Sequence, residues 1–166
     1  ATITITTSKI IIPIIINNTK TVIESQPDKS LLSVLRNMKL FDTKTGCAQG
    51  ICGNCTILLN GKPVPSCKIP VAIVKDQTVT TLEYFKQTEI YSNIIKGFSK
   101  AGIKMCGYCN AGKIFAAYSI ITSGKKPVKQ FIYEHIKNLG LCCTDTKTLA
   151  EGIIYACDLN LKNNGK

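Results

Sequence analysis

Residues 1–82 contain several short runs of β-branched side chains, which favour extended structure. Residues 2–7 alternate threonine with isoleucine, and residues 10–16 are isoleucines interrupted by Pro13. Residues 21–24 follow Asn17-Asn18, a pair that tolerates the backbone angles of a tight turn. We therefore expect strands at 2–7 and 10–16, with 21–24 as the hairpin partner of the second strand.

A helix and a second hairpin follow. Apolar residues recur at helical spacing in the order Leu31, Val34, Leu35 and Met38. Ser30, directly before them, is a favourable N-cap. Residues 56–59 then lead into Asn60-Gly61, a strong signal for a two-residue hairpin turn, and we expect the return strand to end near Cys67. These elements predict one helix packed on a mixed sheet, an α+β arrangement.

Beyond residue 82 the apolar spacing becomes helical. Four segments have an apolar face: 90–101, 109–123, 128–139 and 146–159. Glycines, which commonly end helices, stop the first three. The sequence therefore predicts a four-helix bundle and two domains, 1–82 and 83–166. His135 and Cys157 fall on apolar faces, so we expect a hydrogen-bonded core histidine and a buried structural thiol.

Composition narrows the possible functions. The net charge of +11 comes from twenty lysines and Arg36. The lysines are spread along the chain without an aromatic-interleaved basic stripe, which disfavours nucleic-acid binding and leaves an acidic partner protein as the better expectation. We expect no membrane span and no secretory signal. Nine cysteines without such a signal favour metal binding over disulfides, and a cytoplasmic location.

Four cysteines follow the plant-type [2Fe–2S] pattern, C-x4-C-x2-C and a distant fourth cysteine. They are Cys47, Cys52, Cys55 and Cys67. Glycines at 46, 50 and 53 would let the loop curl around a cluster with its N–H groups near the sulfurs. Zinc is the alternative metal, but zinc commonly takes paired cysteine knuckles, and a C-x4-C spacing makes a poor one. A Rieske centre needs two histidines, and the chain has one.

Three segments together are characteristic: residues 31–36 (LLSVLR), residues 44–67 (KTGCAQGICGNCTILLNGKPVPSC) and the motif Cys106-Gly107-Tyr108-Cys109. In these segments the sequence resembles the small iron–sulfur subunit of the molybdenum hydroxylases, the relatives of xanthine dehydrogenase, aldehyde oxidoreductase and aerobic carbon monoxide dehydrogenase. The resemblance implies a ferredoxin-like β-grasp domain and a helical domain, each with one [2Fe–2S] cluster. It also implies that electrons pass from molybdopterin in a large subunit, through both clusters, to FAD in a third subunit or to another acceptor.

The chain departs from the family around the second cluster. There the family has a Cys-x-x-Cys and a later Cys-x-Cys, but this chain has Leu141-Cys142-Cys143. The resemblance implies the second ligand set Cys106, Cys109, Cys142 and Cys143, in which Cys142 must reach the iron from a neighbouring position. Met105 replaces a glutamine that looks like a pterin contact, so we expect an altered contact there. Asn110-Ala111 replaces Thr-Pro, and Asp145-Thr146 replaces Gly-Tyr.

Three other interpretations of the chain stay open. The helical domain would be vestigial if the second cluster were lost, leaving a degenerate subunit with only the N-terminal cluster. The chain would be a free-standing electron carrier if it docked transiently on varied partners. It would be a structural or regulatory module if its cysteines held zinc, for example through Cys52-x2-Cys55 and Cys106-x2-Cys109.

Overall fold

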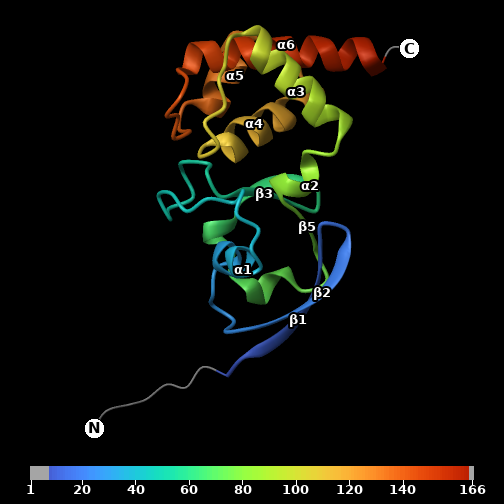
Figure 1. The fold of residues 1–166 in the computed structure, drawn as a ribbon, viewed down its shortest axis with the longest axis vertical. Helices are drawn as coiled ribbons and strands as arrows, with labels where there is room; N and C mark the ends of the chain where they lie inside the picture. Colours follow the sequence, from blue (N-terminus) through green and yellow to red (C-terminus); the bar gives the residue numbers. More distant parts are fainter. Residues whose placement is uncertain (1–7, 165–166) are drawn as a thin grey trace.

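The structure is a computed structural model that describes residues 8–164, so the strand expected at 2–7 lies outside the described residues. A sheet domain and a helical domain stack on one another (Figure 1). Strands β1 (Ile10–Ile16) and β2 (Thr19–Ser25) pair antiparallel. Asn17 and Asn18 join them with φ of 51° and 64°, which confirms the predicted hairpin.

The sheet has five strands in the order β2-β1-β5-β3-β4. β3 (Thr56–Leu59) and β4 (Lys62–Pro65) form the second predicted hairpin. β5 (Thr78–Thr80) lies between the hairpins, parallel to β1 and antiparallel to β3. The strand β5 was not predicted from the sequence. Its three residues are too few to establish an alternating pattern, and tertiary pairing determines it.

Helix α1 (Leu31–Asn37) covers one face of the sheet, and the side chain of Ser30 accepts a hydrogen bond from the Ser33 amide as predicted. Leu31 and Leu35 are fully buried against strand residues such as Ile12 and Val79. Two short 3₁₀ helices, Ser66–Lys68 and Val71–Val74, link β4 to β5. Cys67 thus lies in a 3₁₀ turn just after the return strand.

The C-terminal half is helical: α2 (Leu82–Phe85), α3 (Glu89–Lys100), α4 (Asn110–Thr122), α5 (Lys129–Ile136) and α6 (Thr146–Asn164). The four longer helices match the predicted segments, and α6 extends beyond the predicted end at residue 159. The single-turn helix α2 was not predicted. A five-stranded mixed sheet followed by a helical half confirms the predicted α+β class. None of the described helices is both long and apolar enough to cross a bilayer.

Helix α4 lies over the sheet domain and connects the two halves (Figure 1). Leu58 of β3 belongs to the same buried cluster as Leu82, Phe85 and Phe115 of the helical half. The apolar core of the helical domain therefore continues down to the sheet. The boundary at residue 82 stays a prediction.

Candidate metal centres

The first cysteine set begins in the loop between α1 and β3. The Cys47 Sγ accepts backbone N–H groups from Gln49 at 3.3 Å, from Ile51 at 3.4 Å and from Cys52 at 3.4 Å. These donors, with Cys52 contributing most, lower the pKa of the Cys47 thiol to about 6. A loop that wraps its amides around a sulfur stabilises the thiolate, the form that binds metal.

Cys55 and Cys67 form the other half of this set. Ser66, next to Cys67, holds the Cys55 carbonyl with its amide at 3.2 Å and its hydroxyl at 2.7 Å. The Cys67 thiol interacts with that of Cys55, whose pKa burial raises. Cys47 thus contacts Cys52 and Cys55 interacts with Cys67, but among the described residues these four sulfurs do not converge into one group as those of the second set do. Two thiolates per iron is what a binuclear cluster requires.

Two glycines let this loop pack closely. A Cβ on Gly46 would lie 2.6 Å from the Cys52 Sγ. Gly53 has φ +81°, and a Cβ there would lie 2.7 Å from Leu139 Cδ2 and 3.2 Å from Gly112 Cα in the helical domain. A side chain at 53 would therefore displace the Leu139 side chain and press on the α4 backbone at Gly112.

The second cysteine set converges more tightly. The sulfurs of Cys106, Cys109, Cys142 and Cys143 all lie within 4.8 Å of one another. Cys142 Sγ is 3.2 Å from Cys106 Sγ and 3.4 Å from Cys109 Sγ. Cys109 is buried, whereas Cys106 and Cys142 are exposed. Among the described residues, Cys52 and Cys55 join no such group, so the mixed zinc site with Cys106 and Cys109 does not form.

A tight turn brings Cys142 into this set. The Leu141 amide donates to the Leu139 carbonyl at 3.0 Å, an i to i−2 bond of the γ-turn kind. The Gly140 amide at the same point donates to the Cys52 carbonyl at 2.8 Å. The chain therefore bends sharply just before Cys142, which provides the change of backbone path that the Leu-Cys-Cys sequence needs.

The thiols of the second set differ in acidity. The Tyr108 amide contributes most to lowering the pKa of Cys106 to about 6. Burial opposes the ionisation of Cys109, but hydrogen bonds from Cys142 and Lys113 lower its pKa overall. Hydrogen bonding with Cys106, then with Cys109, raises the pKa of Cys142 to about 12. Crowded thiols cannot all ionise without a cation between them. Four convergent sulfurs with backbone donors therefore fit an iron–sulfur site.

Two residues that depart from the family pattern have local structural roles. The Asn110 Oδ1 accepts the Gly107 amide at 3.1 Å and closes the Cys106–Cys109 loop. Asp145 precedes α6 and accepts the Thr148 amide at 2.9 Å, as an N-cap does. Both side chains stabilise the backbone beside the cysteines.

Lys113, which was not among the predicted site residues, lies beside the second set. It is fully buried on α4, and its Nζ donates to Cys143 Sγ at 2.8 Å. Burial opposes its charge, but the hydrogen bonds to Cys143 and Cys109 raise its pKa overall. The available signal was a charged residue inside the otherwise apolar stretch 111–117.

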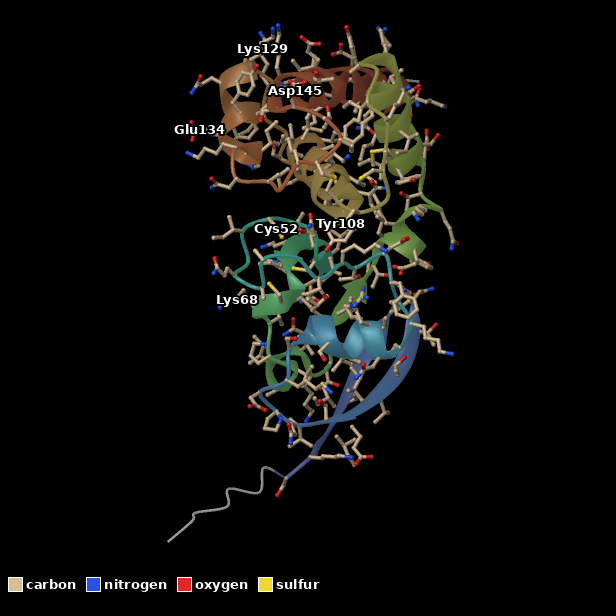
Figure 2. All side chains as sticks on the ribbon, turned by 60° about the vertical axis from the view of Figure 1, so that its left-hand side comes forward. Cys52, Lys68, Tyr108, Lys129, Glu134 and Asp145 are labelled. Carbon is tan, nitrogen blue, oxygen red and sulfur yellow. The ribbon has the colours of Figure 1, made fainter. Side chains whose placement is uncertain are left out.

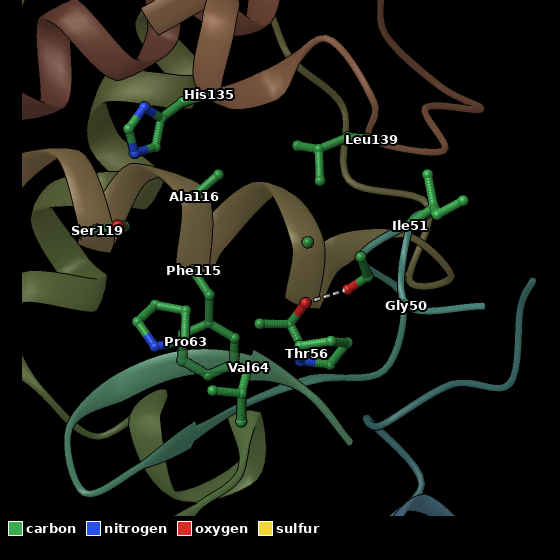
Figure 3. A pocket seen from close by; sticks show the side chains of 13 residues that line it. Gly50, Ile51, Thr56, Pro63, Val64, Phe115, Ala116, Ser119, His135 and Leu139 are labelled. Atoms are coloured by element: carbon green, nitrogen blue, oxygen red, sulfur yellow. Dashed lines mark hydrogen bonds between the residues drawn. The ribbon is translucent and has the colours of Figure 1, made fainter. Parts of the chain in front are cut away.

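The structure also places Met105, Cys157 and His135, whose positions were predicted or discussed from the sequence. Met105 is half-buried against the helical core. Cys157 is buried as predicted, and burial raises its pKa to about 11. The inward placement of His135 is wrong. α5 buries only a narrow stripe, Ile132 and Ile136, and the exposed His135 lines a cleft between the sheet and α4 (Figure 3).

The two cysteine sets meet at the junction between the domains. Tyr108, inside the Cys106–Cys109 loop, donates its hydroxyl to the Thr45 carbonyl at 2.6 Å, two residues before Cys47. Cys52 accepts the Gly140 amide from the other side. Figure 2 shows Cys52 and Tyr108 at this junction. Each loop thus makes a direct hydrogen bond to the loop of the other set.

Comparison with known proteins gives matches along nearly the whole chain. A family described as "2Fe-2S iron-sulfur cluster binding domain" matches residues 17–101, and one described as "[2Fe-2S] binding domain" matches residues 81–154. The nicotinate dehydrogenase small FeS subunit of Eubacterium barkeri is 31% identical over 91% of this chain and 97% of its own. The isoquinoline 1-oxidoreductase subunit alpha of Brevundimonas diminuta is 35% identical over 74% and 82%.

A solved structure agrees with these matches. A chain of quinoline 2-oxidoreductase from Pseudomonas putida 86 superposes with a TM-score of 0.83 at 28% identity, covering 95% of this chain and 98% of that one. Two [2Fe–2S] domain matches that overlap at residues 81–101, relatives matched over 97% and 82% of their own length and a shared fold agree with one another. This chain belongs to the family of small [2Fe–2S] subunits of the molybdenum hydroxylases.

Proposed function

We propose that this chain is the electron-transfer subunit of a heteromeric molybdenum hydroxylase and carries two [2Fe–2S] clusters. Cys47, Cys52, Cys55 and Cys67 would hold the first, and Cys106, Cys109, Cys142 and Cys143 the second. A bound [2Fe–2S] cluster supplies reversible uptake of a single electron. The chain itself contributes thiolate ligands, amide donors to sulfur and the spacing between the sites.

The observation that carries this proposal is the direct contact between the two cysteine loops. The Cys52 carbonyl and the Gly140 amide are 2.8 Å apart, so one hydrogen bond and two residues, Gly140 and Leu141, separate Cys52 from Cys142. Tyr108 and Thr45 provide a second link. Electron transfer weakens steeply with distance, so two sites joined through single hydrogen bonds are suited to relay.

The solvent exposure of two cysteines of the second set supports a multisubunit complex over a free-standing electron carrier. Cys106 and Cys142 are open to solvent in the isolated chain, and a cluster there needs a protein cover to control water access. Exposed apolar side chains occur at both loops, Ile51 at the first and Tyr108 at the second. We assign the second loop, with Met105, to a large molybdopterin-binding subunit. We assign the first to a flavin-binding subunit or another acceptor.

Purification from the native source tests the complex. A tag on this chain is expected to recover two further subunits, with molybdenum and FAD at about one per iron–sulfur chain. The positive net charge of +11 predicts that high salt weakens the assembly, since acidic partner surfaces would be screened. A stable monomer without molybdenum in the cell extract would favour the carrier function instead.

One observation favours a different metal at the second site. Four sulfurs within 4.8 Å of one another also suit a single tetrahedral ion such as zinc. Metal and acid-labile sulfide analysis distinguishes the two possibilities. Zinc with no sulfide at this site would assign it a structural role, and the chain would then keep only its N-terminal cluster.

A further inference from the structure

Lys113 has an unusual environment for a lysine. It is 0% exposed, and it is the one charged side chain among the buried described residues. Lysine is almost never fully buried unless its charge is paired. The ion pairs of the described chain are Lys9–Glu24, Lys86–Asp42 and Lys137–Glu134, so no carboxylate neutralises Lys113.

The position on the helix makes this charge still less favourable. Lys113 is the fourth residue of α4 (Asn110–Thr122), and the N-terminal end of a helix favours negative rather than positive charge. An isolated ammonium buried at this point would be strongly destabilising. Its polar contact is sulfur: Nζ lies 2.8 Å from Cys143 Sγ. The compensating negative charge must therefore come from the cysteine site.

We propose that Lys113 sets the reduction potential of the second cluster by placing a buried positive charge against Cys143. This inference rests on the proposed two-cluster function. Reduction adds one electron to the site and breaks no bond, so its negative charge rises by one unit. A fixed ammonium stabilises the more negative form in a low-dielectric interior, and hydrogen bonds to sulfur act in the same direction.

The first set contains no fully buried charge that matches Lys113. The donors to Cys47 are neutral backbone amides. Near that loop Lys62 and Lys68 are exposed, and Lys44 is half-buried. Water screens an exposed charge far more than a buried one. The effect of Lys113 is therefore confined to the second cluster, which makes the first cluster an internal reference.

The test is an EPR-monitored redox titration of the full-length chain with both clusters loaded. K113M removes the charge and keeps an apolar stem, whereas K113R keeps the charge. K104M is the matched control, because it removes an exposed lysine two residues before Cys106. Iron content is measured first for every variant, and K113Q, which keeps an N–H donor, replaces K113M if K113M loses iron.

In K113M we expect the one-electron reduction constant of the second cluster to fall at least about tenfold, or 59 mV. K113R, K104M and the first cluster should stay near wild type. If the reduction potential of the second cluster were the same in K113M and wild type, the role proposed for Lys113 would be overturned, and the proposed two-cluster function would stand. Loss of iron from both K113M and K113Q would make Lys113 a structural residue. Wild-type protein with only one cluster would instead overturn the proposed function.

Discussion

Cys142 is the residue on which the second site depends most, because the Leu141-Cys142-Cys143 run differs from the family's Cys-x-Cys. Its sulfur touches those of Cys106 and Cys109. In C142A we expect iron to fall from about four to about two atoms per chain, with loss of one EPR signal. C157A, which removes a core thiol that belongs to neither set, should keep all its iron. C142A protein with a full iron content would show that Cys142 is not a ligand.

Cys157 allows a chemical test of the burial of the helical core. Its pKa is raised to about 11 from an ordinary 9.0, so the thiolate fraction at pH 8 falls about a hundredfold. We expect Cys157 in the folded chain to react with iodoacetamide at least that much more slowly than in the urea-unfolded chain, as followed by mass spectrometry. Equal rates in the two states would contradict the buried placement.

At the scale of single residues, local spacing correctly predicted that Ser30 caps α1. The assignment of Cys47, Cys52, Cys55 and Cys67 to the first cluster rests on spacing and stays a prediction. Lys113 stands out in the sequence as a charge inside an apolar stretch, but local spacing could not predict its contact with Cys143, thirty residues further along the chain. His135 was misplaced because helical spacing gives the direction of a face but not the width that neighbouring elements bury.

Packing between helices α3 and α6 depends on glycines, since a Cβ on Gly97 would lie 2.5 Å from the Ala156 amide nitrogen. Backbone cannot move aside easily, so G97A is expected to lower the free energy of unfolding by about 1–3 kcal/mol despite the better helix propensity of alanine. Urea denaturation monitored by circular dichroism measures this.

G152A is the matched control for G97A. A Cβ on Gly152 would meet Ile103 Cδ1 at 2.7 Å, the far end of a flexible side chain. We therefore expect a smaller loss than in G97A. Equal stability of wild type, G97A and G152A would rule out the close helix packing.

Among the elements, hairpins and long helices were predictable because turn residues and apolar periods are local signals. β5 (Thr78–Thr80) and α2 (Leu82–Phe85) were not. Each is a few residues long, and its conformation depends on neighbours distant in sequence. β5 fills the gap between β1 and β3, and α2 is held by Leu82 and Phe85 in the helical core.

On the scale of the whole molecule, Gly53 lets the first cysteine loop pack closely against the helical domain. G53A would combine a strained φ of +81° with a clash against Leu139 and Gly112. G61A has nearly the same φ, +79°, with no atom near its Cβ, so it isolates the backbone strain of about 1 kcal/mol.

We expect G53A to destabilise the chain more than G61A does. It should also expose the Gly140 amide to hydrogen exchange, since that amide bonds to the Cys52 carbonyl across the junction. Identical exchange at Gly140 in both variants would contradict the role assigned to this contact.

The central claim, that one chain carries two linked [2Fe–2S] clusters, is tested most directly by EPR of the reduced full-length protein with iron and sulfide quantitation. We predict about four iron and about four sulfide per chain and two distinct rhombic signals. About two iron per chain with a single signal, and zinc or no metal at Cys106, Cys109, Cys142 and Cys143, would contradict the claim.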